Sequence, residues 1–227
     1  MNARSLCSLA SGLLLLSSVT VRADLAIIQE ISSPDNPKGN MVTTTKSKGD
    51  KIRMDVGTDA SMIIDTKSGE MLTLAHAQKI AIPVSAAMQK MAAKMAGMNA
   101  ESASDPVPPK FKATGRKQDL LGFSCEEYAA TVQGQKLVMW VTEDVPEYKG
   151  LADQLHAFAA QMRQFQNPMA NNPDLPGMPL LTEVTDADGK VTTVRVQAIS
   201  REPLKDADFQ APAGYNKIEM PAMPKME

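Results

Sequence analysis

Residues 51–74, KIRMDVGTDASMIIDTKSGEMLTL, contain three short strand patterns separated by turn-forming residues. In 51–56 the apolar residues alternate strictly with charged ones, which is typical of a strand with one buried face. Residues 62–64 form a second apolar run, and the turn at 66–69 leads to a third run at 71–74. Connections this short between successive strands predict antiparallel pairing.

The same organisation extends in both directions along the chain. Short strand patterns occupy 24–84, and a second group begins at 111 and continues through 142 and again from 180 to 200. Two Pro-rich stretches, at about 99–110 and 167–179, interrupt the pattern and are predicted to be flexible loops. We expect about 9–11 antiparallel strands.

Two segments change to a helical period. In 85–98 the methionines Met88, Met91, Met95 and Met98 are spaced three or four residues apart. In 147–166 the apolar residues Tyr148, Leu151, Leu155, Phe158, Met162 and Phe165 repeat in the same way. Such spacing places side chains on one helical face. The predicted fold class is therefore α+β: a curved antiparallel half-barrel sheet with two amphipathic helices on its concave face.

The first 23 residues have the pattern of a secretory signal peptide. Arg4 precedes an apolar run centred on the leucines at 13–16, and small or aliphatic residues stand at −3 and −1 of a cleavage site after Ala23. We therefore predict an exported, periplasmic protein with one domain over 24–220 and a disordered tail at 221–227. The mature chain is expected to be monomeric, without a transmembrane segment.

Composition excludes some classes of partner. The formal net charge is −2, and because nucleic acid and anionic membrane surfaces both select basic patches, neither is an expected partner. Methionine is abundant, with 16 residues. Apolar surfaces built from this flexible, polarizable side chain suit irregular or adaptable contacts.

Several segments together resemble a known family. They are 49–55, 62–65 with the Gly69 turn, 122–128, 136–142 and the closing 209–215. In this order they resemble a bacterial periplasmic family of unknown function, which is similar in pattern to the carriers and receptors of the outer-membrane lipoprotein-localisation pathway. The resemblance covers about 28–218. It implies a half-barrel whose concave apolar face is covered by helices, a concavity that the lipoprotein carriers use for acyl chains.

The sequence offers little for catalysis. His76 and His156 are the two histidines, and no His or Cys spacing typical of a zinc site is present. No base can be assigned to Cys125, which is predicted to be a buried structural cysteine. We therefore expect a non-enzymatic protein without a cofactor.

The predicted function is the binding of an apolar or acyl ligand, or of a lipidated partner, in the helix-covered concavity. The expected lining residues are Met88, Met91, Met95, Leu155, Phe158 and Trp140. Two alternatives remain open. One is a fully packed domain that binds a partner at its surface. The other is Cu(I) binding by Met-x-x-Met pairs, above all by Met220, Met223 and Met226, because thioethers are soft ligands that suit this ion.

Overall fold

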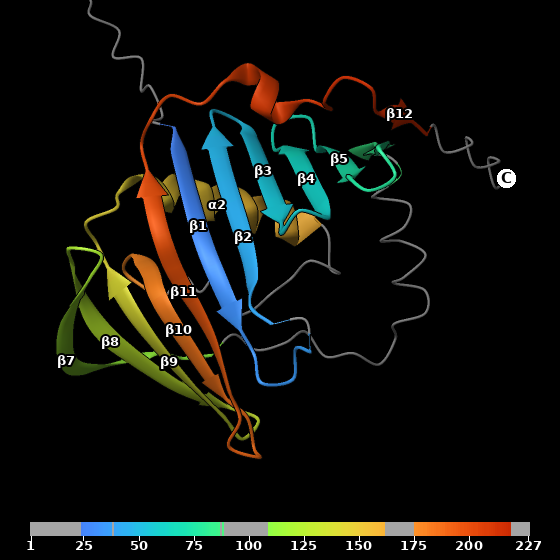
Figure 1. Ribbon diagram of the computed structural model, residues 1–227. Coiled ribbons are helices and arrows are strands. Elements are labelled where there is room, and N and C mark those ends of the chain that lie inside the picture. Colours follow the sequence, from blue (N-terminus) through green and yellow to red (C-terminus); the bar gives the residue numbers. More distant parts are fainter. Residues whose placement is uncertain (1–23, 38, 87, 89–108, 162–174, 219–227) are drawn as a thin grey trace, which may run out of the picture.

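The computed structural model describes residues 24–37, 39–86, 88, 109–161 and 175–218 (Figure 1). In this part of the chain twelve strands form one open sheet, in the order β12-β6-β5-β4-β3-β2-β1-β11-β10-β9-β8-β7. The strands are β1 Leu25–Ser32, β2 Met41–Lys48, β3 Lys51–Val56, β4 Ala60–Asp65, β5 Glu70–Ala75, β6 Ile80–Val84, β7 Lys112–Leu120, β8 Phe123–Val132, β9 Gln135–Thr142, β10 Met178–Thr185, β11 Val191–Ser200 and β12 Asn216–Lys217.

The sheet consists of two meanders joined at β1 and β11. Strands β1 to β6 pair with their neighbours in sequence, as do β7 to β11. All of these pairs are antiparallel, as predicted from the short connections, and only the two-residue β12 runs parallel to β6. The pairing of β1 with β11 brings together segments about 170 residues apart in sequence and makes one sheet of the two meanders.

The predicted fold class, α+β with two amphipathic helices, is wrong. The described residues form a large open sheet with one α-helix, α2 Glu147–Gln161, and a short 3-10 helix, η2 Asp206–Phe209. Ser85, Ala86 and Met88 are the described residues of the other predicted helix, 85–98; the rest of that segment lies outside the described residues. The strand count also exceeds the prediction, because a strand as short as β12 has no sequence pattern of its own.

One face of the sheet carries α2, and we call it the α2 face. Its apolar cluster combines helix residues with strands from across the sheet, among them Ile64 of β4, Leu25 of β1 and Cys125 of β8, and Met71 of β5 packs against it. A flat sheet would measure roughly 38 Å from β5 to β8 at about 4.8 Å per strand, whereas a helix of 15 residues is about 22 Å long. The sheet therefore curves, as Figure 1 shows, with α2 against its far side in that view.

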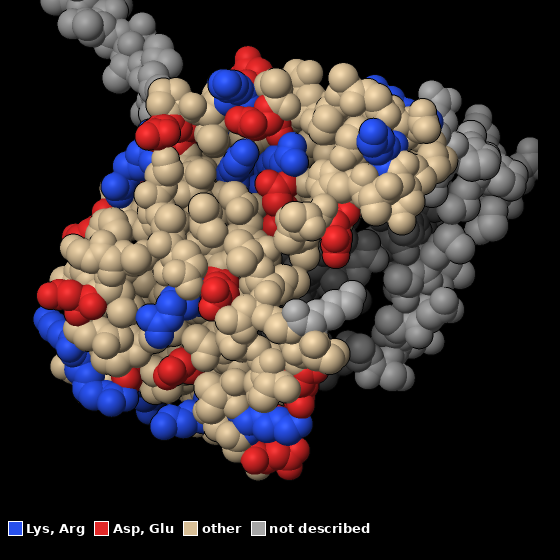
Figure 2. All heavy atoms as spheres, viewed as in Figure 1, with Lys and Arg blue, Asp and Glu red and all other residues tan. Residues whose placement is uncertain are grey.

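The opposite face is covered differently. Ile63, Leu74 and Ala81 form a second, smaller apolar cluster with Phe209 of η2. The segment that follows β11 thus packs over β3 to β6 on the side away from α2. Figure 2 looks onto this face and shows acidic and basic side chains interspersed around a largely uncharged middle. It shows no continuous field of one charge over that middle.

Candidate functional site

The α2 face carries the larger of the two buried apolar clusters of the described residues. Leu151 and Phe158 of α2 are 4 % and 5 % exposed and pack against the sheet, and Tyr148 and Leu155 join them as half-buried neighbours. Their spacing of three and four residues puts these four side chains on one stripe of the helix. The described part of the apolar pattern predicted for 147–166 is therefore the surface by which α2 contacts the sheet, while Met162 and Phe165 lie outside the described residues.

A row of methionines extends this surface beyond the buried core. Met54 and Met62 are directly paired across β3 and β4, and Met71 pairs with Ile64 on the next strand. All three methionines are half-buried and pack against the α2-face cluster. Unbranched thioether side chains adjust to irregular neighbours at low cost. The sheet therefore presents to α2 an apolar surface that the side chains of α2 cover only in part.

One polar side chain interrupts the helix stripe. Gln154 lies three residues after Leu151 and four before Phe158, and it is only 9 % exposed. Its Nε2 donates a hydrogen bond of 3.0 Å to the carbonyl oxygen of Gly49, in the turn between β2 and β3. Its Oε1 is buried and has no hydrogen-bond partner. A polar residue at this point could have been noticed in the sequence, because it falls within the apolar stripe of the predicted helix.

An ion pair between a buried carboxylate and an exposed arginine, Arg116, lies at the other end of the α2 face. Glu127 of β8 is 2 % exposed, and its carboxylate accepts hydrogen bonds from Thr114 Oγ1 and Arg116 Nε, each at 2.9 Å, and from Arg116 Nη2. The Arg116 guanidinium carbon also lies 5.8 Å from the centre of the Trp140 ring. The guanidinium neutralises Glu127 and lies over one side of Trp140, at the border of the apolar cluster.

The structure brings part of the predicted lining together. Trp140 and Phe158 are buried in the α2-face cluster and Leu155 packs against it, while Met88 is half-buried at the end of the described segment after β6. Met91 and Met95 lie outside the described residues, as do Met220, Met223 and Met226 of the copper alternative. The sequence reasoning missed Gln154 and the strand methionines Met54, Met62 and Met71.

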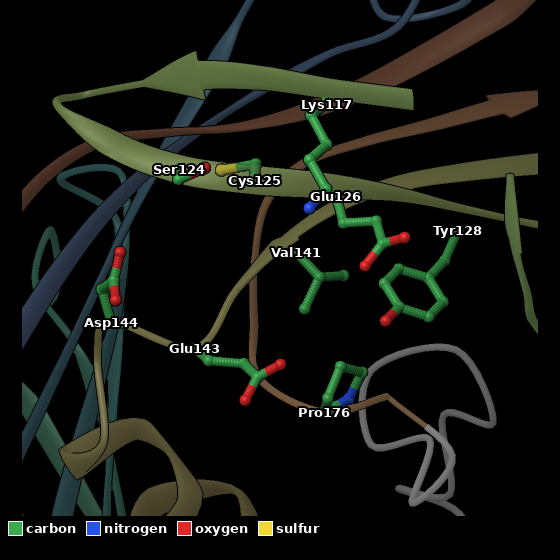
Figure 3. A pocket seen from close by; sticks show the side chains of 9 residues that line it. All are labelled: Lys117, Ser124, Cys125, Glu126, Tyr128, Val141, Glu143, Asp144 and Pro176. Atoms are coloured by element: carbon green, nitrogen blue, oxygen red, sulfur yellow. The ribbon is translucent and has the colours of Figure 1, made fainter. Parts of the chain in front are cut away.

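A separate polar cavity of about 180 Å³ lies near the ends of β8 and β9 (Figure 3). Figure 3 shows the Glu126 carboxylate and the Tyr128 hydroxyl turned toward one space, with Glu143 nearby. Burial and the negative charges of Glu126 and Glu143 raise the pKa of Tyr128, so this phenol stays protonated at neutral pH. The cavity is smaller than the roughly 300–1,000 Å³ of typical small-molecule sites. The remaining lining residues are Lys117, Ser124, Cys125, Val141, Asp144 and Pro176.

Cys125 is buried, as predicted. It is 1 % exposed, and burial raises the pKa of its thiol, which disfavours the reactive thiolate. The Sγ–H donates a weak hydrogen bond to the carbonyl oxygen of Phe123 at 3.6 Å. These surroundings suit a structural thiol in an apolar cluster.

A hydrogen-bonded network lies on the face opposite α2. His76 Nε2 lies 2.7 Å from Ser61 Oγ and His76 Nδ1 lies 2.6 Å from the hydroxyl of Tyr215, while Ser61 also contacts the Asp55 carboxylate. In a serine hydrolase the histidine stands between serine and carboxylate, whereas here the serine stands between the other two. Ser61 is also only 2 % exposed. The network therefore ties Tyr215 and the C-terminal segment to the sheet and does not have the arrangement of a nucleophile.

Two further observations apply to the described residues alone. No group of three or more His, Cys, Asp or Glu side chains is placed to hold a metal ion among them. None of the helices described is long and apolar enough to cross a membrane.

The chain belongs to the family described as "Domain of unknown function (DUF4412)", whose profile matches residues 29–215. The family resemblance predicted from the motifs is thereby confirmed. No curated protein matches the chain significantly.

Solved structures similar to this chain belong to several proteins. PNGF-II is 14 % identical with a TM-score of 0.42, over 87 % of this chain and 31 % of its own. A LolA superfamily protein from Nitrosomonas europaea is 13 % identical with a TM-score of 0.28, over 83 % and 89 %. MucB in complex with MucA(peri) is 8 % identical with a TM-score of 0.38, over 85 % and 55 %. The chain thus spans about a third of PNGF-II.

Proposed function

We propose that this protein is an exported, non-catalytic binding protein that holds an apolar or acyl ligand, or a lipidated segment of a partner, between α2 and the sheet. The observation that carries the proposal is the half-buried methionine row Met54, Met62 and Met71 beside the helix. A ligand chain placed there would complete the cover of an apolar surface that is already continuous with the core. The signal-peptide pattern of residues 1–23 supports export to the periplasm.

The proposed lining combines the residues expected from the sequence with those found on the strands. Leu155, Phe158 and Trp140 would contact the ligand from α2 and β9, and the methionine row would contact it from β3 to β5. Met88, Met91 and Met95 remain proposed as lining from the segment that follows β6. Methionine suits this role because its flexible side chain adapts to chains of different shape.

Trp140 provides a direct test because it is the only tryptophan in the chain. Methyl 12-bromododecanoate should quench Trp140 fluorescence saturably, because bromine quenches indole at short range, and the unbrominated ester should compete. Native mass spectrometry of protein purified from periplasm should show a copurifying lipid.

Two variants make the test specific. Met62→Lys places a charge on the proposed surface and should weaken ester binding at least tenfold. Val42→Lys is the matched control, because Val42 is also an apolar strand residue but is 44 % exposed, outside the α2-face cluster. Absence of quenching in the wild-type protein, or equal loss in both variants, would reject the proposal in favour of a packed domain that binds partners at its surface.

A further inference from the structure

The buried polar atoms of α2 indicate which ligands the α2 face would select. Two buried side-chain atoms of the described residues lack a hydrogen-bond partner, Glu147 Oε2 and Gln154 Oε1, and both belong to α2. The Glu147 carboxylate still has a partner, because its other oxygen, Oε1, accepts a hydrogen bond from Arg201 Nε at 2.9 Å. Gln154 is a different case, because it is neutral and lies within the apolar stripe.

The orientation of the Gln154 amide is fixed by its neighbour. The Gly49 carbonyl oxygen can only accept a hydrogen bond, so the amide nitrogen must face it and the amide oxygen must face away. Gly49 itself is held by the turn between β2 and β3, with a φ of +58°. If the amide nitrogen and oxygen were exchanged, Oε1 would face the Gly49 carbonyl oxygen, and neither of these two acceptors could donate a hydrogen bond. The acceptor Oε1 is thus held in one direction, on a side chain from the same helix face as Leu151 and Phe158.

A buried acceptor without a donor is costly. Leaving such a group unpaired disfavours the folded state by about 1–3 kcal/mol, whereas an apolar side chain of the same shape would avoid this cost. A ligand that supplied a donor would recover that free energy on binding. An ionised carboxylate could not do so, because it only accepts hydrogen bonds and carries a charge into an apolar site.

We propose, on the basis of the proposed function, that Gln154 Oε1 accepts a hydrogen bond from a neutral donor near the head of the bound acyl chain. The ligand class is therefore an acyl or alkyl chain with a hydroxyl or amide N–H group. Free ionised fatty acids and plain esters bind more weakly to the same apolar surface. The acyl or alkyl chain of the ligand contacts Leu151, Phe158 and the methionine row. Gln154 recognises the head group of the ligand through the hydrogen bond to Oε1.

The test compares two probes that differ in one donor. 12-Bromododecan-1-ol and 12-bromododecyl methyl ether have the same chain and the same quenching bromine, but only the alcohol can donate. The wild-type protein should bind the alcohol about tenfold more tightly than the ether, as expected for one hydrogen bond to a buried acceptor. Gln154→Met keeps the length of the side chain and removes the acceptor, so the preference should disappear while binding of the ether is retained.

Gln118→Met is the matched control, because Gln118 lies on the edge strand β7 and not on the helix. It should keep the tenfold preference. Urea denaturation should show Gln154→Met to be folded, with a midpoint close to that of the wild type, since loss of the hydrogen bond to Gly49 offsets the removal of the buried unpaired acceptor. Equal binding of the two probes by the wild type, or a preference that survives in Gln154→Met, would overturn this inference and leave the proposed function standing; a buried water would then be the partner of Oε1. If neither probe quenches Trp140, both proposals fall.

Discussion

Replacing Gly177 by alanine is expected to destabilise the protein by about 3 kcal/mol. A Cβ atom at this position would lie 2.1 Å from the carbonyl oxygen of Thr142, 2.7 Å from its carbonyl carbon and 3.1 Å from the Cα of Glu143. All three are backbone atoms at the end of β9, so no side-chain rotation can relieve the contact. The ends of β9 and β10 must separate, where Thr142 pairs with Met178.

The magnitude follows from the nature of the clash. Inserting a methyl group into a well-packed site typically costs about 1–3 kcal/mol, and a contact with backbone belongs at the upper end of that range. For a chain of this size each kcal/mol lowers the melting temperature by roughly 2–4 °C, so Gly177→Ala should melt about 6–12 °C lower than the wild type. Urea denaturation followed by Trp140 fluorescence measures the free energy of unfolding directly, with a reporter two residues from the clash.

Gly150→Ala is the matched control for this substitution. Gly150 lies inside α2, and nothing is found within 4 Å of the Cβ that alanine would add there. Alanine favours a helix interior over glycine by about 1 kcal/mol, so this variant should be more stable than the wild type. The same chemical change should thus have opposite signs at the two positions. A Gly177→Ala variant within 0.5 kcal/mol of the wild type, on the scale of a neutral surface change, would refute the reasoning.

Three further outcomes are expected. Cys125 should react slowly with a thiol reagent at pH 8 in the folded protein and rapidly in urea, since burial raises its pKa; rapid native labelling would contradict this. The backbone N–H of Ser68 donates a hydrogen bond to the Asp65 carboxylate and lowers its pKa in the folded protein. The ionised carboxylate therefore stabilises the fold at pH values above its unfolded pKa of about 3.9. This stabilisation is lost as the pH falls through the lower pKa of the folded protein. Asp65→Asn should therefore be less stable than the wild type at pH 7 and equally stable at strongly acidic pH, and a pH-independent difference in urea midpoints would count against it. Arg116→Met should cost about 1–2 kcal/mol, because the buried Glu127 loses its cation but Arg116 itself is largely exposed and screened by water, and adding Glu127→Gln should restore part of this loss in urea denaturation.

The strands were predictable because their signals are local. In 51–56 the alternation of apolar and charged residues specifies both the strand and its buried face, and β3 follows it with Ile52 fully buried and Lys51 exposed. The start of α2 at Glu147 was predictable for the same reason. The pairing of β1 with β11 could not be predicted in this way. It joins two meanders through strands that lie far apart in the sequence, and no short-range pattern specifies it.

The site was harder to predict than the fold. In the sequence, Met54 and Met62 look like ordinary inward-facing strand residues. Their half-burial depends on how α2 packs against the sheet, which no local pattern specifies. Along β8 the apolar residues change parity at Glu126 and Glu127, a sequence pattern that is typical of a bulge. The structure instead keeps β8 regularly paired with β9 and places the irregularity on β7, between Ala113 and Lys117. Glu127 can remain on the buried face because an arginine from the neighbouring strand neutralises it.

The two covers of the sheet are held by different kinds of contact, and this favours the α2 side for ligand entry. The C-terminal segment is tied to its face by directional bonds, including Arg53 Nη1 to the Asp208 carbonyl oxygen at 2.9 Å and His76 to Tyr215. An apolar chain could replace none of these bonds, so lifting that segment would leave polar groups unpaired. The first turn of α2 is tied by the ion pair of Glu147 with Arg201, but the described residues of its buried stripe are held by one hydrogen bond, from Gln154 to Gly49, and by apolar packing. An acyl chain can replace apolar packing at little net cost, because burial of apolar area is not directional. An apolar ligand is therefore expected to enter beneath α2 and not beneath the C-terminal segment.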